Sequence, residues 1–270
     1  MRDACWIRRV AVGLIIATLP SGWLLAAKLF SLSLEDVARG RAEVIDLTHD
    51  LDFDAPLFPG GVPFSLEPLS TLTDGYYMNT FSSGEHTGTH VDAPLHFGRG
   101  LPAVDEIPPV RLVSIGIIID VRDQTMANPD YVLSLPDLIA WEKKNVKKIP
   151  PRSFVILNTG WHQRWEQSER YLNRSEDGIM HFPGFSVEAL TYLIETRTVN
   201  GVGTDTASID PGASVELPGH QVLLRGGRYA VENLDNLDLL PTRGFTIIVA
   251  PMKISMGSGA PARVLAIVPR

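Results

Sequence analysis

The amino-acid sequence predicts an α/β fold, a single domain with a mixed sheet, on three observations. Runs of β-branched residues, such as Val113 to Val121, are typical of buried strands. These runs alternate with segments in which apolar residues recur at helical spacing. No internal repeat or second domain boundary interrupts the alternation over 270 residues, a length that one α/β domain can have.

The expected elements follow one another along the chain. Pro56 to Pro63 is dense in proline and glycine, so we expect a loop there. Helices are expected over Leu133 to Lys144 and Ser186 to Thr196, with Ser134 and Ser186 as their N-caps. The other expected elements are a short linker or helix at 31–41, a helical turn at 221–224, and strands at 44–48, 154–157, 199–204, 245–250 and 262–268.

The N-terminal residues differ in composition from the rest of the chain. Arg2, Arg8 and Arg9 precede an uncharged run from Val10 to Ala27. Positive charge ahead of an apolar run is the layout of a signal peptide or signal anchor. We therefore expect residues 1–30 to direct export, with attachment to a membrane only if the segment stays uncleaved. A buried N-terminal helix is the alternative.

Charge and cysteine content exclude several classes of function. The net charge is −7 and no basic stretch is present, which argues against a nucleic-acid partner. Cys5 is the only cysteine, so an internal disulfide, a thiolate metal site and a cysteine nucleophile are excluded from the globular part. No Gly-x-Ser-x-Gly motif is present, which argues against a serine nucleophile. Any metal must be held by histidine and carboxylate.

Titratable residues are concentrated between His86 and His96. This run contains three of the seven histidines, and Asp92 lies among them. In a strand His90 and Asp92 would be ~6.6 Å apart, close enough to share an ion, whereas an extended chain would separate His86 from His90 by ~13 Å. The backbone must bend between the two histidines, and Gly88 permits that bend.

The donor set indicates which metals fit. Imidazole nitrogen and carboxylate oxygen suit Zn²⁺ or Mn²⁺, and three ligands with open positions are typical of a catalytic site. His96 lies four residues beyond Asp92, so an extended backbone would carry it ~13 Å away. We expect His96 to approach bound water without being a ligand.

The run His86-x-Gly-Thr-His90-x-Asp92-x-Pro-x-His96 resembles the signature of the bacterial cyclase family. This family includes metal-dependent kynurenine formamidases and isatin hydrolases. The likeness runs from about Val44 to the C-terminus, and we assign residues 42–270 to a cyclase-family hydrolase domain. It includes Phe58-Pro-Gly, Asn158-Thr-Gly-Trp, Gly203-Thr-Asp205, His220, Glu232-Asn-Leu and Gly257-Ser-Gly.

The resemblance implies a swivelling β/β/α fold, a homodimer and one or two divalent metal ions, Zn²⁺ or Mn²⁺. It implies that His86, His90 and Asp92 hold one ion, and that Asp92 holds a second with His220 and Glu232. His96 would be the general acid/base. Phe58, which stands where the formamidases have tryptophan, would pack on the substrate ring.

Residues outside the signature leave alternatives open when taken on sequence alone. His220 and Glu232 are as consistent with surface positions as with ligation. Asp205 either orients a ligand histidine or caps a turn. Gly257 to Gly259 is interpreted as a tight turn, and the histidines that match no family ligand are interpreted as surface or packing residues: His49, His162 and His181.

The predicted function is metal-dependent hydrolysis of a small-molecule amide. The main hypothesis is an arylformamidase acting on a substrate such as N-formylkynurenine, a compound of tryptophan catabolism. The alternative is a cyclic amide or lactone hydrolase of the isatin type. A hypothesis from another class is an exported metal- or solute-binding protein without turnover. His96 argues against it, because mere binding needs no base beyond the ligand set.

Overall fold

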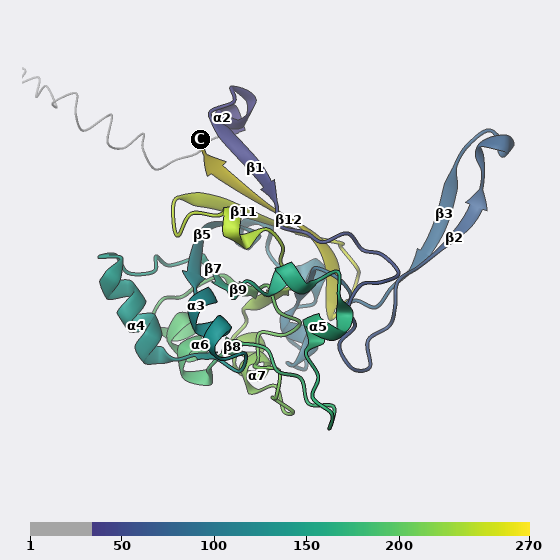
Figure 1. The fold of residues 1–270 in the computed structure, drawn as a ribbon. Coiled ribbons are helices and arrows are strands. Elements are labelled where there is room, and N and C mark those ends of the chain that lie inside the picture. Colours follow the sequence, from purple (N-terminus) through teal and green to yellow (C-terminus); the bar gives the residue numbers. More distant parts are fainter. Residues whose placement is uncertain (1–33) are drawn as a thin grey trace, which may run out of the picture. The chain divides into compact units, whose positions relative to one another are not determined.

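The computed structural model describes residues 34–270, so the predicted export segment lies outside the described residues. Eight strands form one mixed sheet in the order β1-β12-β11-β5-β7-β9-β10-β4 (Figure 1). Their bounds are β1 (Ala42–Asp46), β4 (His90–Asp92), β5 (Val113–Asp120), β7 (Phe154–Asn158), β9 (Gly201–Thr204), β10 (Tyr229–Glu232), β11 (Phe245–Pro251) and β12 (Gly259–Pro269). Neighbouring strands from β5 to β10 pair in parallel, and the other pairs are antiparallel.

Strand β12 closes the sheet on itself. Its first residues pair with β4, and its later residues pair with β11 and β1. Because β4 also pairs with β10, the strands from β12 to β4 form a closed ring. This closure places β4, a strand of only three residues, between two partners that fix its position on both edges.

Alternation along the central strands produces two cores. In β7, Phe154 and Ile156 belong to one buried cluster, while Val155 and Leu157 belong to another, as the period of two in a strand requires. The second cluster also contains apolar residues of α4, α6 and α7, so these helices cover one face of the parallel strands (Figure 1). The helices are α2 (Leu34–Ala38), α3 (Arg122–Ala127), α4 (Leu135–Lys144), α5 (Ser168–Leu172), α6 (Val187–Glu195) and α7 (Pro218–Arg225).

The prediction of one α/β domain with a mixed sheet is confirmed. Helices α4 and α6 begin where expected, because the Ser134 and Ser186 hydroxyls accept hydrogen bonds from the backbone N–H groups of Asp137 and Ala189. The helical turn expected at 221–224 is part of the longer helix α7. Within residues 34–270 no helix is both long and apolar enough to cross a membrane.

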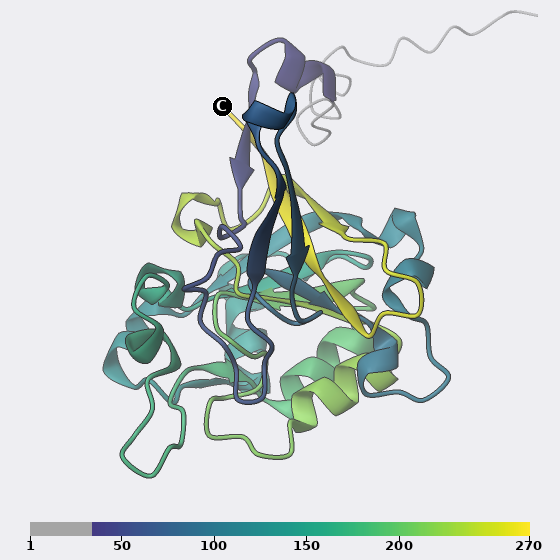
Figure 2. The ribbon, with the colours of Figure 1, turned by 90° about the vertical axis from the view of Figure 1, so that its right-hand side faces the viewer.

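A hairpin of β2 (Ser65–Ser70) and β3 (Met78–Ser82) was not predicted. It extends away from the eight-stranded sheet in Figure 1 and lies in front of that sheet in Figure 2. Most of its residues are exposed, including Leu66, Leu69 and Phe81. A strand with no buried face lacks the alternation that makes strands recognisable in sequence. A second small sheet joins β6 (Val132–Leu133) to β8 (Gly184–Phe185).

Candidate metal centre

Strand β4 sets two of the predicted ligands side by side. His90 and Asp92 share one face of the strand, whereas Val91 points into the core. Glu232 on β10 is the direct cross-strand neighbour of His90. Its Oε2 atom lies 3.5 Å from Nε2 of His90, and Oδ1 of Asp92 lies 3.3 Å from the same nitrogen.

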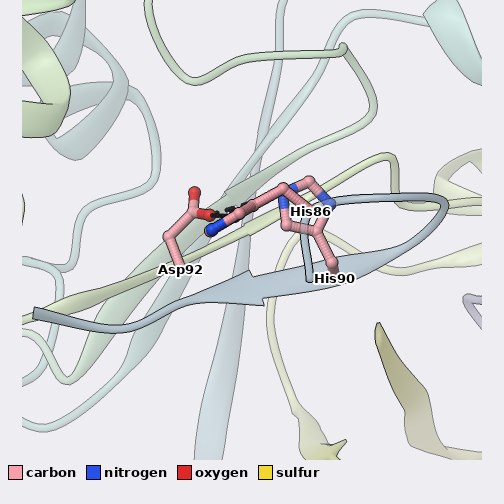
Figure 3. Close-up of side chains that lie close together, drawn as sticks. All are labelled: His86, His90 and Asp92. Atoms are coloured by element: carbon pink, nitrogen blue, oxygen red, sulfur yellow. Dashed lines mark hydrogen bonds and ion pairs between the residues drawn. The ribbon is translucent and has the colours of Figure 1, made fainter. Parts of the chain in front are cut away.

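The turn before β4 brings His86 back to this face. Gly88 has φ +70°, so the predicted bend at this glycine is confirmed. Nδ1 of His86 lies 2.5 Å from Oδ1 of Asp92, and Figure 3 shows the His86, His90 and Asp92 side chains turned toward one another. The Gly88 carbonyl accepts hydrogen bonds from Nδ1 of His90 and Nδ2 of Asn233, at 2.9 and 2.7 Å.

Helix α7 brings His220 to the same cluster. Nε2 of His220 lies 3.0 Å from Oε1 of Glu232 and 3.4 Å from Oδ2 of Asp92. Glu232 and His220 are both buried, so the alternative of surface positions is wrong for both residues. Asp92 therefore faces two groups: Oδ1 points toward His86 and His90, and Oδ2 points toward His220.

The cluster fits a divalent cation. Among the described residues, two groups each offer ligand atoms that lie within 4.8 Å of one another. One group is His86, His90 and Asp92, and the other is Asp92, His220 and Glu232. Oδ2 of Asp92 is buried and has no hydrogen-bond partner among the described residues. A buried carboxylate oxygen without a partner is costly unless a cation compensates it.

Electrostatics within the cluster favour positive charge. Burial favours neutral His90, but the carboxylates of Asp92 and Glu232 together raise the pKa of His90 to about 9. Burial opposes charge on His220 and Asp92 as well. Even so, Glu232 and Asp210 hold the pKa of His220 well above its usual value. In the same way, His90 and His220 hold the pKa of Asp92 well below the usual value of an aspartate. A site that stabilises positive charge beside ionised carboxylates suits a metal cation bound to neutral imidazoles and carboxylates.

His96 reaches the cluster by a different route from the one predicted. The backbone after Asp92 is not extended, because Pro94–His96 forms a 3₁₀ turn. The His96 ring consequently stacks on that of His86, with centroids 4.0 Å apart. Its ring makes no hydrogen bond with a described residue. His96 thus lies beside the ligand cluster with both ring nitrogens available.

The cluster lines a cavity of about 430 Å³. His86, His90, Asp92, His96, His220 and Glu232 all border it. Phe58 borders it too and is half-buried against a neighbouring apolar cluster. The other apolar residues on the wall are Pro56, Pro59, Val62, Phe97, Ala207 and Leu217. The cavity lining therefore combines the imidazole and carboxylate groups of the cluster with apolar side chains, as the lining of small-molecule sites usually does.

Several residues around the cluster were not identified from the sequence. Asp210, which accepts hydrogen bonds from His220, lies on a loop ten residues away, and no spacing rule connects the two. Glu85, directly before His86, accepts a hydrogen bond from the Ser258 hydroxyl, and no sequence pattern marks this role. Asp205 was considered as a residue that orients a ligand. It instead accepts hydrogen bonds from Thr159, Trp161 and His162, so it holds a turn and a histidine outside the cluster.

The histidines expected to play no part are indeed elsewhere. His49 is buried and stacks on Trp165, with ring centroids 4.0 Å apart. His162 is buried against Asp205, and His181 is half-exposed beside Asp130. The turn predicted at 257–259 is present in part, because Gly259 already belongs to β12 and pairs with Asp92.

A mixed α/β fold with imidazole and carboxylate groups converging on a cavity, and a further imidazole beside them, is the arrangement of a metal-dependent hydrolase. The chain belongs to the cyclase family: the family model described as "Putative cyclase" matches residues 45–211. The family predicted from the run His86 to His96 is thereby confirmed.

Relatives and solved structures agree with this assignment. The chain is 32% identical to isatin hydrolase from Roseibium aggregatum, over 86% of this chain and 94% of the relative. It is 30% identical to kynurenine formamidase from Polaromonas naphthalenivorans, over 82% and 88%. The structure of isatin hydrolase A from Ralstonia solanacearum superposes with a TM-score of 0.82 at 38% identity, over 94% of this chain and 100% of that one.

Proposed function

We propose that this chain hydrolyses the C–N bond of a small aryl amide, with a cyclic amide of the isatin type as the first candidate substrate. The observation that carries the proposal is the position of His96, which lies beside the ligand cluster and borders the cavity without a hydrogen-bond partner among the described residues. The choice of substrate is supported by the likeness to isatin hydrolases, at 32% identity in sequence and 38% in the structural comparison.

The proposal assigns the cluster to metal binding. His86, His90 and Asp92 would hold one divalent ion, Zn²⁺ or Mn²⁺, and Asp92, His220 and Glu232 would hold a second where two are bound. A cation bound there supplies a Lewis acid that polarises a carbonyl oxygen and lowers the pKa of water. Asp92 has one carboxylate oxygen toward His90 and the other toward His220, so the cluster suits one bound ion or two.

His96 is proposed to move the proton. Partial removal from water lowers the pKa of His96 to about 4, because the neighbouring imidazoles add to this effect and the opposing charge of Asp92 does not offset it. The ring of His96 is therefore neutral at pH 7. A neutral ring nitrogen takes a proton from the attacking water as the new C–O bond forms. The same nitrogen returns the proton to the amide nitrogen as the C–N bond breaks, which yields an aryl amine and a carboxylic acid that then loses its proton to water.

The apolar wall of the cavity would hold the aryl ring. Phe58 borders the cavity from a loop dense in proline and glycine, and Phe97 borders it beside His220, with ring centroids 5.2 Å apart. Packing of a flat substrate ring against Phe58 would contribute binding energy from apolar contact. Replacing Phe58 by alanine is expected to raise KM more than it lowers kcat.

N-formylkynurenine is the second candidate substrate. The likeness to kynurenine formamidase, at 30% identity, supports it. Hydrolysis of an N-formyl arylamine needs the same cluster and the same proton transfer by His96, so the two candidates differ only in the shape of the substrate.

Parallel turnover assays with isatin and N-formylkynurenine, each with added Zn²⁺ or Mn²⁺, test the proposal. We expect kcat/KM to be larger for isatin. A larger value for N-formylkynurenine would favour the arylformamidase instead. No turnover of either substrate by metal-loaded protein would favour binding without catalysis.

A further inference from the structure

A chain of hydrogen bonds leads from His86 away from the cavity. Nε2 of His86 lies 3.0 Å from the hydroxyl oxygen of Ser258. That hydroxyl in turn lies 2.5 Å from Oε2 of Glu85, and the backbone N–H of Ser258 donates to the same carboxylate oxygen at 3.1 Å. Glu85 and His86 are adjacent in sequence, whereas Ser258 lies 172 residues after His86, directly before β12.

The chemistry of these groups fixes the direction of each hydrogen bond. A carboxylate only accepts, so the hydroxyl of Ser258 donates its proton to Glu85. The oxygen of Ser258 then has only lone pairs to offer the ring, and Nε2 of His86 must carry the proton. The lone pair of the neutral imidazole is consequently on Nδ1, the nitrogen that faces Asp92.

We propose that Glu85 and Ser258 are positioning residues that hold His86 in the tautomer and orientation needed to bind the metal. This inference rests on the proposed metal site. The other two histidines of the cluster are held in the same manner: Nδ1 of His90 donates to the Gly88 carbonyl, and Nδ1 of His220 donates to Asp210. Each cluster histidine thus has one nitrogen toward the site and the other on a fixed acceptor, as metal-binding histidines generally do.

Metal affinity of the purified full-length chain, measured by chelator competition with Zn²⁺ and Mn²⁺, tests this proposal without any substrate. Ser258→Ala and Glu85→Ala are each expected to weaken affinity by ~10–100-fold, the usual effect of losing an outer-shell partner. The double variant is expected to be no weaker than the weaker single variant, since both substitutions break the same chain. Ser258→Thr, which keeps a hydroxyl, is expected to restore part of the affinity.

Ser258→Ala separates the proposal from a purely structural role. Glu85 also anchors the backbone N–H of Ser258, and that hydrogen bond survives the removal of the hydroxyl. If Glu85 served only the turn, Ser258→Ala would bind metal with wild-type affinity, and the proposal would be overturned. Strictly additive losses in the double variant would overturn it as well. The absorption spectrum of bound Co²⁺ gives a second readout, because reorientation of His86 is expected to shift the d–d bands.

Two controls complete the experiment. Ser83→Ala removes a nearby hydroxyl that donates to the Gly84 carbonyl, and metal affinity is expected to be unchanged. His86→Ala tests the site itself. Loss of the metal in His86→Ala together with wild-type affinity in Ser258→Ala would refute the positioning role alone. Retention of the metal in His86→Ala would refute the proposed ligand set.

Discussion

The carboxylate of Asp210 accepts hydrogen bonds from both the backbone N–H and Nδ1 of His220, at 2.9 and 2.7 Å. Its other oxygen accepts from the N–H of Gly219 at 2.6 Å. Asp210 therefore satisfies two N–H groups of the first turn of α7 and fixes the ring of the histidine in that turn. One buried side chain holds both the helix and the side chain that it brings to the cluster.

Asp210→Asn is expected to weaken metal binding by ~10–100-fold, because an amide holds the His220 ring less firmly than a carboxylate. The measurement is metal content after dialysis against graded chelator. Asp205→Asn is a matched control, since Asp205 holds the N–H and Nδ1 of His162 in the same way but outside the cluster. Asp205→Asn is expected to lower thermal stability without changing metal affinity. Equal metal affinity in both variants would contradict the role given to Asp210.

His96→Ala is expected to keep its metal while kcat falls by ~10²–10⁴, the usual contribution of a positioned acid/base. The reason is that His96 lies against His86 by ring stacking and outside both sets of potential ligand atoms. Metal content and kcat measured on the same preparation check this prediction. Near-normal kcat in the metal-loaded variant would leave His96 as a substrate contact or a packing residue.

Gly259→Ala is expected to displace His86. A Cβ atom at Gly259 would lie 2.5 Å from Cε1 of His86 and 2.5 Å from the carbonyl oxygen of Val91. Both distances are far inside van der Waals contact, so the overpacking costs about 1–3 kcal/mol and the ring must move. Thermal unfolding and metal affinity are the measurements. A wild-type unfolding temperature together with wild-type metal affinity would show that the close approach of His86 to β12 affects neither stability nor metal binding.

Residues 1–30 are expected to direct export, because Arg8 and Arg9 stand before the uncharged run from Val10 to Ala27. A reporter fused after residue 40 is expected outside the cytoplasm in a bacterial host. Replacing the apolar run by a polar sequence of equal length serves as the control and is expected to keep the reporter inside. Cytoplasmic reporter in the unmodified fusion would favour the buried-helix alternative.

Local sequence patterns were sufficient to predict much of the fold. The β-branched run of β5 and the serine caps of α4 and α6 are local signals, and the structure has a strand or helix at each of these places. The bend at Gly88 was predictable because two ligands four residues apart cannot meet on an extended chain. The homodimer and the export segment stay predictions.

The remaining features depend on contacts that only folding creates. The 3₁₀ turn at Pro94–His96 is set by Pro94 and by the packing around it, so the extended geometry assumed for His96 was wrong. Asp210 and Ser258 reach the cluster because α7 and β12 pack against β4 and its neighbours, and no periodicity in the sequence records that packing. The β2–β3 hairpin has largely exposed strands and hence no alternation to detect.

A metal-depletion experiment tests whether amide hydrolysis depends on an ion held by His86, His90 and Asp92. Isatin ring opening is followed by absorbance with protein stripped of metal by a chelator and then reloaded with Mn²⁺ or Zn²⁺. We expect no turnover by the stripped protein, recovery on reloading, and no recovery in His90→Ala at the same metal concentration. Undiminished turnover by the stripped wild type, or by His90→Ala, would contradict this dependence.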